Sequence, residues 1–136
     1  MIPVHPISPK LILSIDDDPV ILSYEKALLE RSGYAVMTAS SVQQGLGLVT
    51  VNEFDAVLID YKMPDMNGCD AGSEIKRLRP EQVVILLSGD EVPSYTQAVA
   101  DAFLHKLEVA RELLPTIAKL CNRDHKPQRK QPKPCR

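Results

Sequence analysis

The sequence predicts an α/β domain in which one parallel sheet carries helices on both faces. Five short apolar segments, at 11–15, 34–39, 56–60, 83–87 and 102–105, have the length and composition of buried strands. The longer segments between them show apolar residues at helical spacing, and the connections are short. Strands and helices that alternate in this way form right-handed β-α units, and therefore a doubly wound sheet.

The first helix follows an acidic turn, Asp16-Asp17-Asp18. Pro19 suits the first position of a helix, and Asp18 suits its cap. Gly33 is expected to end this helix in the left-handed conformation that glycine adopts readily. The expected inner face consists of apolar residues at helical spacing, namely Val20, Ile21, Tyr24, Ala27 and Leu28.

The second and third helices carry weaker signals. Ser40 or Ser41 is expected to cap the second helix, which two internal glycines weaken by about 1 kcal/mol each. The third helix is expected to run from Gly68 to about Arg79, where Pro80 stops it. The expected inner residues are Val42, Leu46 and Val49 in the second helix and Ala71, Ile75 and Leu78 in the third.

The last third of the chain predicts one stunted helix and one full helix. The segment 93–100 is short and poorly patterned, so a fourth helix there should be reduced. The last helix is expected over about 109–122, and Pro115 should distort it. Its apolar residues are Leu113, Leu114, Ile117 and Leu120.

At 136 residues the chain is long enough for one domain. We expect an N-terminal extension at 1–9, a domain at 10–122, and a disordered basic tail at 123–136 that is rich in proline. Residues 122–136 hold six basic residues and one acidic residue, which leaves −7 on the rest of a chain whose net charge is −2. A basic tail without aromatic residues is more typical of a solvated terminus than of nucleic-acid binding. No apolar segment approaches the roughly 20 residues of a membrane span, and a cytoplasmic location is expected.

Polar side chains stand at the ends of four of the predicted strands. Asp16 and Asp17 end the first, Asp60 the third, Ser88 the fourth and Lys106 the fifth. If these strands are neighbours, the side chains converge, because ligand chemistry in parallel sheets collects at the carboxyl ends. Three crowded carboxylates repel one another unless a cation is present, and Mg²⁺ prefers such oxygen ligands.

These residue types together suit phosphoryl transfer onto an aspartate. Asp60 would be the nucleophile, Lys106 a point charge for a phosphoryl oxygen, and Ser88 a hydroxyl donor. Each residue taken alone is commonly a turn former or a surface residue. Their occurrence at successive strand ends favours one shared site.

The chain resembles the receiver domain of the two-component response regulators, over roughly 10–122. The motifs that carry the resemblance are Ile15-Asp16-Asp17-Asp18-Pro19, Asp60-Tyr61-Lys62-Met63-Pro64 with Gly68, Ser88-Gly89 and Phe103-Leu104-His105-Lys106. The resemblance implies a flavodoxin-like sheet in the order 2-1-3-4-5. This is one of the common strand orders of doubly wound sheets, and known receiver domains have it.

The resemblance also implies the function. Asp60 would accept a phosphoryl group from a histidine kinase or a histidine phosphotransfer protein and relay the signal to a downstream effector. Asp17, Asp60 and the Lys62 backbone carbonyl would hold Mg²⁺, with Asp16 helping through water. The protein would then be a signalling domain that catalyses only its own phosphotransfer and dephosphorylation.

The resemblance further implies a switch. Ser88 would move inward toward the new phosphoryl group, and Phe103 would occupy the volume that Ser88 vacates. Because Phe103 has no hydroxyl to desolvate, phosphate would bias an existing equilibrium rather than create a new state. The readout would be the surface of residues 90–100, the fifth strand and the last helix, through which the protein would bind an effector or dimerise weakly.

Three departures from the family concern the output side. Leu107 stands where the family has a proline in a cis bond, which leaves the aim of Lys106 open. The fourth helix is short, and Ala100 replaces a glycine. Two alternatives remain: a pseudo-receiver that binds proteins without phosphorylation, and an aspartyl-phosphate hydrolase, which Lys62 disfavours because that class places an acid at this position.

Overall fold

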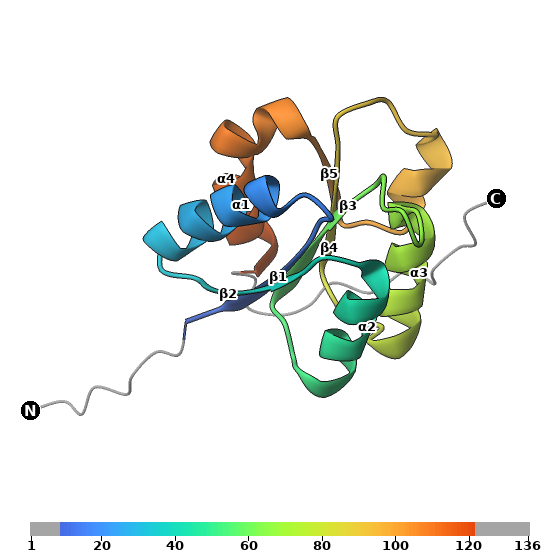
Figure 1. Ribbon diagram of the computed structural model, residues 1–136, viewed down its shortest axis with the longest axis horizontal. Helices are drawn as coiled ribbons and strands as arrows, with labels where there is room; N and C mark the ends of the chain where they lie inside the picture. Colours follow the sequence, from blue (N-terminus) through green and yellow to red (C-terminus); the bar gives the residue numbers. More distant parts are fainter. Residues whose placement is uncertain (1–8, 122–136) are drawn as a thin grey trace, which may run out of the picture.

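The computed structural model describes residues 9–121. Its centre is a five-stranded parallel sheet in the order β2-β1-β3-β4-β5 (Figure 1). This confirms the predicted fold class and strand order. The predicted extension and basic tail lie outside the described residues, apart from position 9. The strands are β1 (Leu11–Ile15), β2 (Ala35–Ala39), β3 (Ala56–Asp60), β4 (Val84–Ser88) and β5 (Ala102–His105).

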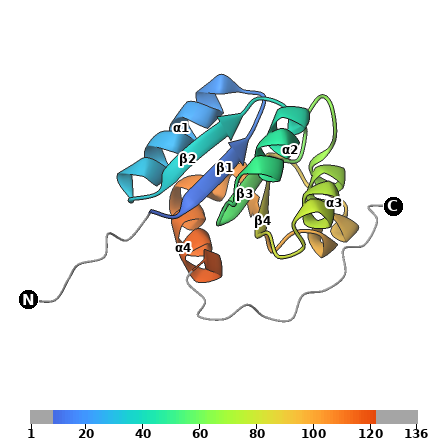
Figure 2. The same ribbon diagram turned by 90° about the horizontal axis from the view of Figure 1, so that it is seen from below.

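Helices cover both faces of the sheet, as Figures 1 and 2 show. On one side lie α1 (Pro19–Arg31) and α4 (Val109–Cys121), and on the other lie α2 (Val42–Val51) and α3 (Gly68–Leu78). Neighbouring strand residues point to opposite faces, so the strands feed two apolar clusters. The cluster under α1 and α4 contains Ile12, Leu29 and Leu113. The one under α2 and α3 contains Leu13 and Ile75. Among residues 9–121, no helix combines the length and apolar character needed to cross a membrane.

The register of the central strands sets the position of the strand ends. In the pairing of β1 with β3, Ile15 lies level with Ile59. The next residue along each strand direction is an aspartate, so Asp16 and Asp60 become neighbours across the strand pair. Between β1 and β3 the strand order changes direction, and ligands of doubly wound sheets bind at this kind of position.

Local capping explains where the first helices begin and end. Asp18 accepts a hydrogen bond from the Val20 backbone N–H at 2.9 Å and caps α1. Gly33 ends the turn after α1 with φ of +95°, as predicted. Of the two candidate caps for α2, Ser41 is the one used, because its hydroxyl accepts the Gln44 N–H at 3.1 Å.

Two predicted helix faces are wrong in detail. The inner residues of α1 are Glu25 and Leu29, whereas Val20 is 74% exposed. The cap at Asp18 and packing on β1 set the rotation of the helix, and the predicted apolar stripe is displaced by one position. In α3, Ile75 is buried as predicted, but Leu78 faces outward.

The segment between β4 and β5 holds a short 3₁₀ helix, η1 (Ser94–Ala98), where the sequence predicted a reduced fourth helix. This confirms the predicted stunting.

Lys76 of α3 is buried and pairs with Asp101 at 2.8 Å, and Asp101 also accepts the Val84 N–H that opens β4. The last helix runs from Val109 to Cys121 with Pro115 inside it, so the proline does not end the helix. Pro115 lies on the exposed face.

Gly68 opens α3 where the chain returns to the end of β3. Its backbone N–H donates to the Tyr61 carbonyl at 2.8 Å. A Cβ at this position would stand 2.8 Å from the Tyr61 Cα and 2.9 Å from a Leu86 methyl. Gly68→Ala should therefore lower the free energy of unfolding by about 1–3 kcal/mol, measured by urea denaturation.

Gly47→Ala is the matched control, because a Cβ at Gly47 meets nothing within 4 Å. This change in a helix interior should stabilise the protein by up to about 1 kcal/mol. Equal stability of the two variants would contradict the close approach at Gly68.

Candidate functional site

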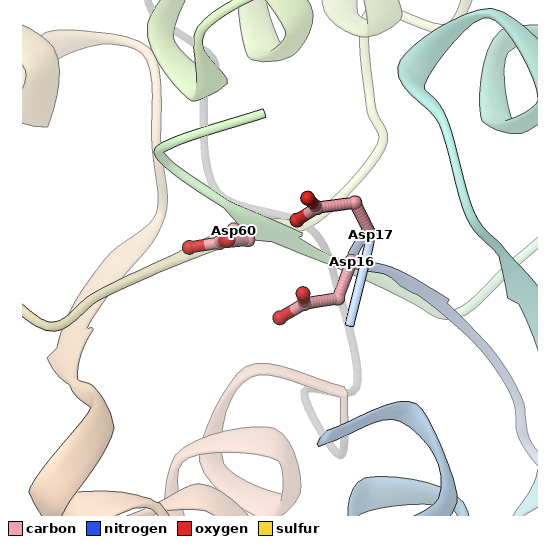
Figure 3. Close-up of side chains that lie close together, drawn as sticks. All are labelled: Asp16, Asp17 and Asp60. Atoms are coloured by element: carbon pink, nitrogen blue, oxygen red, sulfur yellow. The ribbon is translucent and has the colours of Figure 1, made fainter. Parts of the chain in front are cut away.

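Three aspartates gather at the carboxyl ends of β1 and β3. Asp16 and Asp60 are buried and Asp17 is exposed, and one carboxylate oxygen of each lies within 4.8 Å of the others. In Figure 3 the three side chains point to the same side of the strand ends. The structure thus brings together the aspartates that the sequence predicted to converge.

Lys106 lies against two of these aspartates. Its Nζ is 3.2 Å from Asp60 Oδ1 and 3.5 Å from Asp16 Oδ2. The other oxygen of Asp16 accepts the Asp18 backbone N–H at 2.9 Å. Lys106 therefore points into the site although Leu107, and not a proline, follows it. Residues 9–121 contain no cis peptide bond.

A capping box shapes the turn that carries Lys106. After β5 the chain forms one 3₁₀ turn, η2 (Lys106–Glu108). His105 Nδ1 accepts the Leu107 N–H at 3.1 Å, and the Glu108 carboxylate accepts the His105 N–H at 3.0 Å. These reciprocal hydrogen bonds define the turn without a proline. The signal was a polar residue three positions before a glutamate, which the sequence interpretation missed.

Burial and mutual repulsion both act on the aspartates. Burial raises the pKa of Asp60, with Asp17 adding to the increase, while Lys106 and the Lys62 backbone oppose it. Burial likewise raises the pKa of Asp16, and the Asp18 N–H and Lys106 oppose it. Burial disfavours the charge of Lys106, but Asp60 and Asp16 outweigh this and raise its pKa. The ionised site is therefore held together by one ammonium against three carboxylates.

This donor set fits a hard divalent cation. The carboxylates supply oxygen ligands, and a single lysine leaves negative charge uncompensated. Mg²⁺ takes one or two carboxylates and keeps several waters, which suits a site with one exposed aspartate. The Lys62 carbonyl stays a predicted ligand. The Lys62 side chain is exposed and forms an ion pair with Asp90 in the loop after β4.

Ser88 is the last residue of β4 and is buried. Its hydroxyl donates to the Asp90 carbonyl at 2.8 Å and accepts the Asp90 N–H at 3.1 Å. Both hydrogen bonds lie within the loop that follows β4. Ser88 thus ends the strand next to β3 but forms no hydrogen bond with Asp16, Asp17 or Asp60. Phe103 is half-buried and lies level with Leu86 on the α2–α3 side of the sheet.

Asp65 braces the loop that follows Asp60, a role that sequence reasoning missed. Its carboxylate accepts the backbone N–H groups of Val42 and Gln43 at 3.2 and 3.0 Å. Burial alone would raise the pKa of Asp65, but the hydrogen bonds from Gln43 and Val42 lower it. Asp65 thus ties the β3–α3 loop to the start of α2, because helix N-termini favour anions.

A doubly wound sheet with an aspartate cluster and a lysine at its carboxyl edge defines a receiver-type signalling domain. The family model of the response regulator receiver domain matches residues 12–118, and the chain belongs to this family.

Relatives and solved structures agree with this assignment. The sensory/regulatory protein RpfC of Xanthomonas campestris pv. campestris is 36% identical over 120 residues, which are 80% of this chain and 16% of RpfC. The transcriptional regulatory protein CpxR of Escherichia coli is 32% identical over 117 residues, which are 84% of this chain and 50% of CpxR. The chain thus spans half or less of these curated relatives.

Two solved receivers show the same fold. A CheY-like receiver domain of Methanospirillum hungatei is 32% identical with a TM-score of 0.79, and the match covers 85% of this chain and 95% of that one. The response regulator TrrA of Thermotoga maritima, solved in complex with Mg²⁺ and BeF, is 28% identical with a TM-score of 0.77 over 82% and 98% of the two chains.

The raised pKa of Asp60 predicts how stability depends on pH. An ionised Asp60 destabilises the folded protein above its folded pKa, and this cost disappears as the pH falls toward the ordinary value of 3.8. Without divalent cations, Asp60→Asn should therefore melt at a higher temperature than the wild type at pH 7. The difference should shrink as the pH approaches 4.

The control is Asp70→Asn, which makes the same change at an exposed aspartate in the first turn of α3. It should not raise the melting temperature. A lower melting temperature for Asp60→Asn at pH 7 would mean that the attraction of Lys106 outweighs burial.

Proposed function

We propose that this protein accepts a phosphoryl group on Asp60 from a phosphohistidine of a histidine kinase or histidine phosphotransfer protein, in a reaction that depends on Mg²⁺. The observation that carries the proposal is the position of Asp60. It ends a buried strand beside two further aspartates, with the Lys106 ammonium 3.2 Å from one oxygen. The complex of TrrA with Mg²⁺ and BeF supports the same chemistry for a related receiver.

In the proposed step, a carboxylate oxygen of Asp60 attacks the phosphorus and forms the new P–O bond. The P–N bond to the donor imidazole breaks, and the imidazole leaves with the electron pair. Lys106 would pair with a phosphoryl oxygen as charge develops. Asp16, Asp17, Asp60 and the Lys62 carbonyl would hold Mg²⁺, which offsets the negative charge of carboxylates and phosphoryl group.

The proposed role is a signalling one. The protein would catalyse its own phosphorylation and dephosphorylation, and no other substrate is required. With donors of this kind the protein would act in the cytoplasm. The phosphorylated form would act on an effector protein through the surface around η1, β5 and α4.

Labelling with a small phosphodonor should identify Asp60 as the modified residue. Incubation with acetyl phosphate and Mg²⁺ should add one phosphoryl group to Asp60, located by mass spectrometry after borohydride trapping. Asp60→Asn and omission of Mg²⁺ should each remove the label, while Asp70→Asn should keep it. Absence of any label on the wild type would favour the pseudo-receiver, and a label on another residue would show that the nucleophile is misassigned.

Exposed apolar residues flank the site and support docking of a protein donor. Leu107, directly after Lys106, is 89% exposed, and Val20, in the first turn of α1, is 74% exposed. Leu107→Glu should slow transfer from a purified histidine phosphotransfer domain by about tenfold, because a charge replaces an apolar contact. Labelling by acetyl phosphate should not change, since that donor needs no docking surface.

Val51→Glu is the matched control, because Val51 is 75% exposed at the end of α2, away from the strand ends that hold the aspartates. It should leave both rates unchanged. Equal slowing of both donors in Leu107→Glu would instead indicate damage to Lys106.

The proposed switch involves Ser88 and Phe103. Phosphorylation should draw the Ser88 hydroxyl from the Asp90 carbonyl, 2.8 Å away, toward a phosphoryl oxygen. Amide NMR shifts with Mg²⁺ and beryllofluoride should then change at Asp90, at Phe103 and within residues 90–100. Ser88→Ala should abolish the changes beyond the aspartates. Changes confined to the aspartates and Lys106 would contradict this switch.

A further inference from the structure

Ser14 and Glu25 form a buried polar pair between β1 and α1. The Ser14 hydroxyl donates to a Glu25 carboxylate oxygen, and both side chains are at least 98% buried. Within residues 9–121 the Glu25 carboxylate makes no other hydrogen bond or ion pair. A buried carboxyl with a single hydroxyl partner is costly, because burial disfavours its charge. The mechanism proposed above makes no use of it.

The pair lies one layer below the aspartates. Ser14 precedes Asp16 by two residues on β1, so both side chains point to the same face of the sheet, about 7 Å apart along the strand. Glu25 approaches this face from α1. The charged groups that act on Glu25 are Asp16 from β1, Asp60 from β3 and Lys106 after β5. Neither β2 nor α4 contributes one.

These surroundings place the titration of Glu25 near neutral pH. Burial raises the pKa of Glu25 to about 7, against the hydrogen bond from Ser14, and the charge of Asp16 adds to the increase. Near neutral pH a fraction of the molecules therefore carry a proton on Glu25. A cation held by the aspartates would favour the ionised form of Glu25, and ionised Glu25 would favour the cation, since such coupling is reciprocal.

We propose that Glu25 is a further acidic residue of the metal site. Its negative charge would stabilise Mg²⁺ bound at the aspartates without direct contact, so that protonation of Glu25 weakens Mg²⁺ binding and Mg²⁺ binding favours loss of the proton. The inference rests on the proposed Mg²⁺ site and adds one residue to it. It makes Mg²⁺ binding, and with it the phosphorylation competence of Asp60, sensitive to pH near neutrality.

The direct test is ¹³C NMR titration of the Glu25 carboxyl in the full chain, without divalent cation and with saturating Mg²⁺. Mg²⁺ should move the midpoint to lower pH. Calorimetry in buffers of different ionisation enthalpy should show that Mg²⁺ binding at pH 7 releases up to about half a proton from Glu25, because a group with its midpoint there is half protonated.

Variants separate charge from packing. In Glu25→Gln the gain in Mg²⁺ affinity between pH 6 and pH 8 should be about fivefold smaller than in the wild type, and fewer protons should be released on binding. Glu30→Gln is the control, because Glu30 lies on the same helix but is exposed and pairs with Lys26. It should behave as the wild type. If Glu25→Gln fails to fold, the wild-type titration decides.

Three outcomes distinguish the ideas. An unmoved Glu25 midpoint with normal Mg²⁺ binding would overturn the inference and leave the proposed function standing. An unchanged pH dependence in a folded Glu25→Gln would do the same and assign Glu25 a structural role. Absence of Mg²⁺ binding by the wild type would overturn the proposed metal site and this inference together.

Discussion

The repulsion among three aspartates at two adjacent strand ends is the constraint on which the rest of the site depends. The parallel register of β1 and β3 places Asp16 next to Asp60, and a one-residue slip of either strand would turn its aspartate to the opposite face. Lys106 compensates one charge, at 3.2 Å from Asp60. The remaining negative charge makes the cluster suitable for a cation.

Hydrogen bonds brace the loops around the site, and in the β3–α3 loop they add to the packing of Met63 in the core. Asp65 attaches the β3–α3 loop to the start of α2, and Gly68 lets that loop return close to Tyr61. On the opposite side, His105 and Glu108 close the turn that presents Lys106. These contacts hold the charged groups in place before any ligand arrives, so that less ordering is needed when one binds.

Much of the fold and the aspartate cluster could be predicted from the sequence, because both depend on local patterns. Apolar runs of strand length marked the five strands, and Asp16, Asp17, Asp60 and Lys106 followed directly at their ends. The prediction of the buried face of α1 was wrong, because that face depends on how the helix is rotated about its axis against the sheet. The apolar residues of α1 indicated an inner face with Val20, whereas the structure buries Glu25 against Ser14.

The sequence by itself determined the order of strands and helices, the cap of the first helix and the residues at the strand ends, because propensity, periodicity and turn chemistry act between near neighbours in the chain. Only the tertiary structure decided which distant groups meet. Asp65 reaches Val42 across 23 residues, and Lys106 reaches Asp16 across 90. The buried Ser14–Glu25 pair belongs to the same class, since a charged side chain enters a core only where another segment supplies a partner, and no local pattern records that partner.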